Sequence, residues 1–156
     1  MCPEFSYSKG RILPSIEFIL KEMNDFDQHF PEMTWNNYRM LDSLKIKALE
    51  KTVENILTAL IEVAGTIAIE NEKIVENYSA ALSEAALIIG LSEDKAVILG
   101  KLAGMRNRLA HRYLDFKWET IKAYINAHPS IMDFLNCVVA REKKKLAKET
   151  SGEILQ

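Results

Sequence analysis

Residues 34–67 read TWNNYRMLDSLKIKALEKTVENILTALIEVAGTI, and apolar side chains recur along this stretch at the spacing of one face of an α-helix. Thr34 is a suitable N-cap, because its hydroxyl can accept a hydrogen bond from the first backbone N–H groups of a helix. The pattern therefore predicts a very long helix that begins at Thr34 and is the longest element of the fold. Its apolar stripe comprises Tyr38, Leu41, Leu44, Leu49, Val53, Ile56, Leu60, Val63 and Ile67.

Shorter amphipathic segments flank this long helix. A first helix is predicted from Leu13 to a point just before Pro31. After the polar segment that follows the long helix, another helix is predicted from Ser79 until Gly90 stops it. Ser92 caps the next helix, and the two acidic residues after it suit the positive end of the helix dipole.

Two further helical pieces are predicted in the last third of the chain. A short piece around Trp118 is expected to end at Pro129, because proline disrupts a helix interior. A last helix follows and ends in the cationic run REKKKLAK at residues 141–148, which suits the negative end of a helix dipole. Residues 149–156 are expected to be frayed.

Composition supports an all-helical class. The chain has 156 residues, of which 48% are hydrophobic, and its six glycines and four prolines are few for a protein built from many turns. This length suits one domain with one core. We predict an all-α fold over residues 1–156, an up-and-down four-helix bundle with one or two short extra helices and flexible ends at about 1–9 and 149–156.

Charge and cysteine content narrow the function classes. The net charge of −2 gives the whole molecule no attraction for nucleic acid or anionic membranes, so any polyanion must meet a local patch. Cys2 and Cys137 lack the spacing of a disulfide framework or a zinc site. No apolar run reaches the ~18 residues of a membrane span, and the acidic first thirty residues do not resemble a signal peptide. A cytoplasmic location is expected.

The positive charge of the chain gathers in one segment. Residues 101–117 contain five basic residues and one acidic residue, a local balance of +4. Within this segment the sequence MRNRLAHRYL places Arg106, Arg108 and Arg112 around His111. Arginine offers a planar fork of donors that can hold two phosphate oxygens, so the segment predicts phosphate binding. Taken singly, these residues also fit a solvated helix end.

A histidine beside arginine adds proton transfer to phosphate binding. The ordinary pKa of histidine, ~6.5, lets His111 accept or donate a proton near neutral pH. On RNA, His111 could take the proton of a 2′-hydroxyl while Arg106 neutralises the charge that builds on the phosphate oxygens. This chemistry gives a cyclic phosphate without a metal, and DNA should resist it.

Helix geometry separates these two residues. At ~100° per residue, Arg106 and His111 lie about 140° apart on an uninterrupted helix. We therefore expect the helix to end or bend between Ala110 and Tyr113, or a second protomer to bring its own copy across a two-fold axis. A symmetric dimer would also supply one histidine as base and another as acid.

The run MRNRLAHRYL resembles the R-x4-H-x-Y signature of the HepT-like proteins, a branch of the HEPN superfamily. The matching residues are Arg106, Asn107, Leu109, His111 and Tyr113. The similarity extends roughly over residues 12–146, through the helix order and the long second helix. Arg112 departs from the pattern, because glycine is frequent there, and it either adds a phosphate contact or crowds the bend.

The resemblance implies a homodimeric, metal-independent ribonuclease toxin without a cofactor, in which Arg106 and His111 are the catalytic residues. It also implies a partner, a minimal nucleotidyltransferase antitoxin that attaches AMP to the motif tyrosine, here Tyr113. In this reading Asn107 orients the site, and the phosphate-binding residues are Arg108 and Arg112.

Two other readings stay open. The chain could be a non-catalytic helical module that binds nucleotide or nucleic acid beside a nucleotidyltransferase, or a structural dimer with a basic edge. Two other histidines, His29 and His128, precede or adjoin prolines and are expected in loops or caps. The sequence contains neither a histidine motif of metalloproteases nor a phosphate-binding loop.

Overall fold

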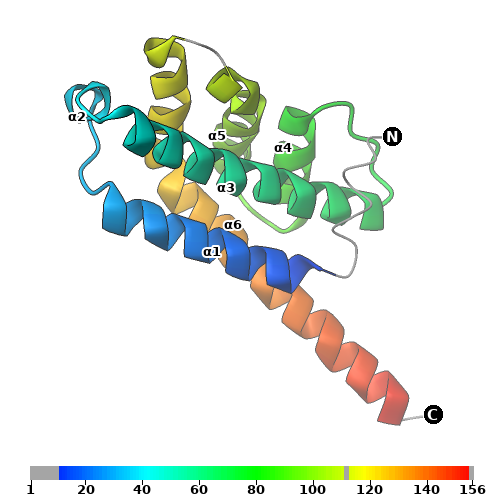
Figure 1. The fold of residues 1–156 in the computed structure, drawn as a ribbon. Helices are drawn as coiled ribbons and strands as arrows, with labels where there is room; N and C mark the ends of the chain where they lie inside the picture. Colours follow the sequence, from blue (N-terminus) through cyan, green and yellow to red (C-terminus); the bar gives the residue numbers. More distant parts are fainter. Residues whose placement is uncertain (1–10, 111–112, 155–156) are drawn as a thin grey trace.

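The computed structural model describes residues 11–110 and 113–154. Within them the chain forms six α-helices and one 3-10 helix, with no strand, so the all-α class is confirmed. Figure 1 shows their arrangement. In chain order the elements are α1 (Ile12–His29), α2 (Trp35–Arg39), α3 (Ser43–Glu70), α4 (Tyr78–Ile88), α5 (Glu93–Gly104), the 3-10 helix η2 (Arg106–Ala110) and α6 (Leu114–Ile154).

The hydrophobic core lies where α1, α3, α4, α5 and α6 meet. α1 packs along α3, and α4 packs against both α3 and α5. α6 passes behind α1 and α3, contacts η2 and α5 along its first half, and then projects from the bundle (Figure 1). α3 crosses the centre of this arrangement and has more buried residues than any other single helix among those whose buried residues are given.

The stretch predicted as one helix from Thr34 is two helices. Thr34 caps the short α2, since its Oγ1 accepts the Asn37 N–H at 3.2 Å. Asp42 then caps α3, since its Oδ1 accepts the Lys45 N–H at 2.9 Å. An aspartate that caps a new helix competes with helix continuation, and the apolar Leu44 beside it remains exposed. α3 therefore begins later than predicted.

α6 is the longest element, with 41 residues, and it contains Pro129. The prediction of two pieces separated at Pro129 was wrong. Proline in a helix interior costs about 3 kcal/mol, whereas fully burying one large apolar side chain gains about 1.5–3 kcal/mol. Ile121 and Tyr124 before the proline and Phe134 after it are all buried in the one core, so packing holds both halves in a single helix. The helix also continues to Ile154, through most of the segment 149–156 that was expected to be frayed.

The other predicted helices are confirmed with small shifts at their ends. α1 occupies the predicted segment before Pro31. α4 is capped by Asn77, whose Oδ1 accepts the Ala80 N–H at 2.8 Å, and it begins at Tyr78, one residue before the predicted start at Ser79. Ser92 caps α5 as predicted, and Gly90 has a φ of +99° in the turn before it.

α3 is long and apolar enough to cross a membrane by length and composition, with a mean hydropathy of 1.5 in its best window. However, 67% of that window is buried inside the protein. The apolar surface of α3 is therefore used by the core of the bundle.

Candidate functional site

The polar segment after α5 does not continue that helix. α5 ends at Gly104, and the chain tightens into η2, in which Arg108 N–H donates to the carbonyl of Met105 at 2.9 Å. The same carbonyl accepts the Thr120 hydroxyl of α6 at 3.2 Å. Glycine weakens a helix interior, so Gly104 favours an end of α5. The Met105 carbonyl after it accepts these two hydrogen bonds instead of one from a continuing α-helix. The helix was predicted to end or bend between Ala110 and Tyr113. η2 does end at Ala110, before α6 begins at Leu114, but α5 has already ended at Gly104.

Arg106 is held by residues from two other helices. Its Nε donates to Oγ1 of Thr58 on α3 at 2.8 Å, and its Nη2 lies 4.0 Å from Oε1 of Glu54. Its guanidinium carbon lies 5.7 Å from the centre of the Tyr78 ring on α4, in cation–π range. Arg106 therefore has a fixed side-chain position although its own backbone is in a short 3-10 helix.

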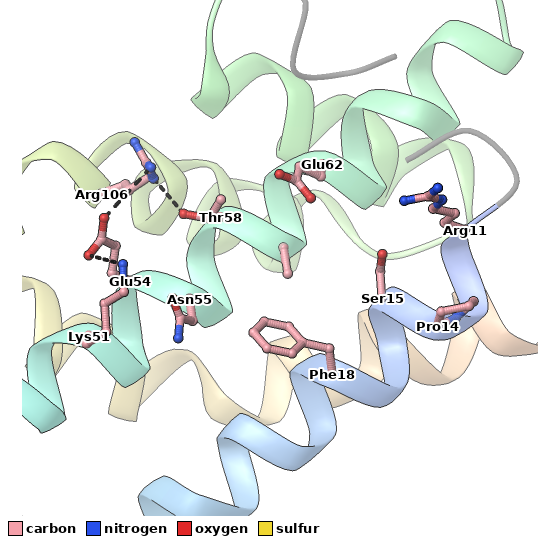
Figure 2. A pocket seen from close by; sticks show the side chains of 11 residues that line it. Arg11, Pro14, Ser15, Phe18, Lys51, Glu54, Asn55, Thr58, Glu62 and Arg106 are labelled. Atoms are coloured by element: carbon pink, nitrogen blue, oxygen red, sulfur yellow. Dashed lines mark hydrogen bonds and ion pairs between the residues drawn. The ribbon is translucent and has the colours of Figure 1, made fainter. Parts of the chain in front are cut away.

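Arg106 stands at one end of an open groove between α1 and α3 (Figure 2). The groove has a volume of about 430 Å³, and Arg11 stands at its other end. The half-exposed ring of Phe18 points from α1 into the space between them (Figure 2). An arginine at the end of a groove that mixes polar and apolar side chains can bind an anionic ligand. The other lining residues are Pro14, Ser15, Lys51, Glu54, Asn55, Thr58, Ala59 and Glu62.

The two residues after Arg106 are exposed. Asn107 Oδ1 accepts a long hydrogen bond from Arg106 Nη1 at 3.5 Å, which fits a role in orienting the guanidinium. Arg108 Nη1 forms an ion pair with Oε2 of Glu119 on α6. Arg108 was predicted to bind phosphate, and in this structure its guanidinium is occupied by a carboxylate.

Tyr113 lies on the surface immediately before α6. Its side chain is 58% exposed, and its ring meets the ring of Phe116 edge-on, with centroids 6.0 Å apart. Its exposure leaves the residue accessible to a modifying enzyme. His111 and Arg112 lie outside the described residues, so the predicted meeting of Arg106 with His111 stays a prediction.

The positive patch counted along the sequence is partly neutralised in space. Lys117 is only 18% exposed, and its Nζ lies 3.1 Å from Oε2 of Glu50 on α3. The other oxygen of Glu50 accepts the Tyr38 hydroxyl at 2.9 Å. Burial, together with this hydrogen bond and the negative charge of Glu50, raises the pKa of Tyr38 above its ordinary value. Lys117 therefore belongs to a structural network rather than to a phosphate-binding surface.

The residues of α3 that contact Arg106 and Lys117 were not predicted from the sequence. Thr58, Glu54 and Glu50 lie on α3, more than forty residues before their partners in the chain. No local pattern indicates such contacts. Glu50, Glu54 and Thr58 are spaced four residues apart on the polar side of α3, beside its apolar stripe, so the sequence indicates only that they share a helix face.

The two histidines outside the polar segment, His29 and His128, both lie in helices. His128 Nε2 lies 4.0 Å from Oδ2 of Asp27, which links α6 to α1 within a helix rather than in the predicted loop. His29 is the last residue of α1. No cluster of three or more histidine, cysteine, aspartate or glutamate side chains among the described residues could hold a metal ion. The expectation of metal-independent chemistry stays a prediction.

The bundle and the polar segment after α5 define an all-α, HEPN-like protein. The model of the Ribonuclease HepT-like family matches residues 19–138, roughly three-quarters of the chain. The chain belongs to this family of ribonucleases. No curated protein and no solved structure gives a significant match.

Proposed function

We propose that this protein is a metal-independent ribonuclease toxin that works as a homodimer in the cytoplasm. Membership of the HepT-like ribonuclease family supports RNA as the substrate. The observation that carries the proposal is the fixed guanidinium of Arg106. Oγ1 of Thr58 accepts a hydrogen bond from its Nε, while its Nη2 has only a 4.0 Å contact with Glu54. The outer N–H groups of the guanidinium can therefore bind a phosphate.

In the proposed reaction, neutral His111 removes the proton of a ribose 2′-hydroxyl. The 2′-oxygen attacks the adjacent phosphorus, a P–O2′ bond forms and the P–O5′ bond breaks. The products are a 2′,3′-cyclic phosphate and a 5′-hydroxyl, whose oxygen needs a proton as it leaves. Arg106 stabilises the charge on the non-bridging phosphate oxygens during this step.

The need for an acid as well as a base favours the homodimer. One histidine cannot hold and lack the proton at the same moment, whereas His111 of the partner subunit can protonate the leaving 5′-oxygen. Arg106 lies in an open groove at the surface, which a second subunit could close. In this proposal Asn107 orients the guanidinium, and Arg108 and Arg112 hold neighbouring phosphates.

The proposed control is AMP transfer to Tyr113 by a minimal nucleotidyltransferase antitoxin. The Tyr113 oxygen attacks the α-phosphorus of ATP, a phosphodiester forms and pyrophosphate leaves. The exposed position of Tyr113 suits such a reaction. The added nucleotide places bulk and negative charge two residues from His111, in a site that must bind RNA phosphate.

The test compares the purified chain with Arg106→Ala and His111→Ala, using a DNA strand that contains a single ribonucleotide, so that only one 2′-hydroxyl is present. We expect cleavage at that ribonucleotide in the presence of a chelator, a cyclic phosphate on the 5′ fragment, and loss of cleavage in both variants. Cleavage that survives His111→Ala, with RNA binding intact, would refute the catalytic role and favour the binding module. AMP-sized mass on Tyr113 after co-expression with the antitoxin tests the control step.

A further inference from the structure

The last part of α6 lies outside the hydrophobic core. Within the described residues, Val138 is the last side chain of α6 that is fully buried. From there the helix continues to Ile154, and Figure 1 shows this orange to red part projecting from the bundle. Packing of the core therefore does not explain the composition of residues 141–148.

This projecting part carries a strong positive charge. Residues 141–148 contain five basic residues and one acidic residue, although the whole chain has a net charge of −2. By sequence alone, these cations suit the negative end of a helix dipole. That explanation fails, because the dipole acts within the last turn and α6 has no basic residue in its last turn.

Only some of these cations have structural partners. Arg141 and Lys145 each lie 2.8 Å from Oε2 of Glu70 at the end of α3, and these ion pairs attach α6 to the bundle. The exposed Lys143, Lys144 and Lys148 have no carboxylate within ion-pair distance in the described part of the chain. Their charges are therefore available to an external partner.

The basic residues also form a shaped surface. Lys144 and Lys148 lie one turn apart on the same helix face, beside a hollow of about 460 Å³ between α6 and the α4 end. The lining of the hollow combines apolar side chains with basic ones. Its lining residues are Asn71, Ile88, Ile89, Cys137, Ala140, Arg141, Lys144, Lys145 and Lys148.

We infer that the α6 arm, defined as residues 141–148, binds the phosphate backbone of the RNA substrate away from the point of cleavage. The inference rests on the proposed function only in taking RNA as the polyanion. Lysine ammonium groups bind phosphates as point charges without reading sequence, which suits backbone contact. A phosphate backbone carries negative charges at regular intervals, which matches lysines spaced along a helix.

The length of α6 sets the size of the RNA. Thr120 hydrogen bonds to the carbonyl before Arg106, so the beginning of α6 lies beside the proposed catalytic arginine. At ~1.5 Å per residue, Lys144 lies about 36 Å farther along the helix axis. A stacked strand with a rise of about 3.4 Å per nucleotide needs about 11 nucleotides to cover this distance. The arm therefore favours long or structured RNA over short fragments.

Binding is tested on the full-length Arg106→Ala chain, which should hold RNA without cutting it. The arm variant is Lys144→Gln with Lys148→Gln, and the matched control is Lys21→Gln with Lys47→Gln, two exposed lysines on α1 and α3. Both pairs change the net charge equally, and glutamine keeps the helix propensity of lysine. The probe is a labelled single-stranded RNA of about 30 nucleotides, titrated at several NaCl concentrations, because each lost phosphate contact lowers the salt slope by about 0.7.

We expect the arm variant to bind this RNA about tenfold more weakly near physiological salt and to lower the salt slope by about 1.4, as two lost phosphate contacts predict. The control pair should leave both values unchanged. With Arg106 intact, the arm variant should raise KM for the long RNA and leave cleavage of an RNA of about five nucleotides unaltered, since that RNA cannot reach the arm.

Equal affinities and slopes for the two variants, or no RNA binding at all, would overturn the inference. So would unchanged RNA binding accompanied by loss of self-association in sedimentation, which would make the arm a contact between copies of the chain. Arm-dependent RNA binding by a chain that cuts no RNA would support the inference while refuting the proposed cleavage, so the two failures are distinguishable.

Discussion

Thr58→Val should slow RNA cleavage, because it removes the acceptor that fixes Arg106 without touching the arginine. The Nε to Oγ1 distance of 2.8 Å is that of a good charged hydrogen bond. Such bonds contribute about 1.5–3 kcal/mol. The Arg106 side chain is 27% exposed, so water replaces part of the contact and the lower value applies. A loss of about 1.4 kcal/mol corresponds to a roughly tenfold decrease in kcat/KM.

Two variants separate positioning from general damage to α3. Thr58→Ser keeps the hydroxyl and should retain most of the activity. Thr52→Val makes the same chemical change on the same helix, where the hydroxyl donates to the Ala48 carbonyl at 2.8 Å instead of accepting from arginine, and should cleave normally. Denaturant unfolding of all three variants checks that they fold to similar stability.

The assay is initial-rate cleavage of a fluorogenic RNA, combined with a double-mutant cycle. In an Arg106→Lys background, which keeps the positive charge but lacks Nε, Thr58→Val should have a much smaller effect than in the wild type, because the bond that it removes is already absent. Wild-type cleavage by a well-folded Thr58→Val variant would refute the reasoning. An equal loss in both backgrounds would also refute it, since the threonine would then act independently of Arg106.

Further predictions concern stability. Burial alone would raise the pKa of the Glu70 carboxyl, but hydrogen bonds from Lys145 and Arg141 outweigh it and lower the pKa below its ordinary 4.5. The stability contributed by this carboxylate is therefore present above pH 4.5 and is lost as the pH falls below it. Glu70→Gln should lower the free energy of unfolding by about 1 kcal/mol at pH 7 and by much less in acid, measured by urea unfolding. Gly100→Leu should cost about 2 kcal/mol or more, because even a Cβ there would stand 3.1 Å from Ser83 Cβ. A Cβ at Gly152 meets nothing within 4 Å, so Gly152→Leu is the control, and melting temperatures that fall equally in the two variants would contradict this prediction. Lys117→Met should cost about 1–3 kcal/mol by leaving Glu50 buried without its cation, and a neutral result would show that Tyr38 alone satisfies that carboxylate.

The sequence predicted the elements whose signals are local. For α5 the local signals were sufficient: Ser92 as the N-cap, two acidic residues in the first turn, and an apolar stripe. For α1, Pro31 marked the end of the helix. Competing local signals were harder to rank. The apolar stripe crosses residues 40–42 without interruption, yet Asp42 caps a new helix there, so capping prevailed over periodicity.

Pro129 shows the opposite outcome. Its local signal, a missing N–H and a steric clash, correctly indicates a cost. The gain that outweighs this cost comes from α1, α3 and α5, which all contact α6 and bury side chains such as Tyr124 before the proline and Phe134 after it. Such packing between distant segments is absent from any local window, so the prediction of a break could not be corrected from the sequence alone.

The sequence indicates the residue types of the candidate site but not its charge balance. Counting charges along residues 101–117 gave +4, but three carboxylates from outside that segment lie beside it in the structure. These contacts differ in what they leave available. Lys117 is largely buried against Glu50 and serves the fold. Arg108 and Glu119 are both about half exposed, and such surface pairs are worth less than about 1 kcal/mol.

An RNA phosphate can therefore displace Glu119 from Arg108 at little cost, but it cannot recruit Lys117 without opening the Glu50 network. Arg106 stands between these cases. Its Nε is committed to Thr58, which fixes the direction of the side chain, while its Nη2 contact with Glu54 is at the 4.0 Å limit of an ion pair. A guanidinium that is anchored on one edge and weakly engaged on the other is preorganised for phosphate without being neutralised beforehand. That division of contacts makes Arg106, rather than the total charge of the segment, the reason to expect catalysis here.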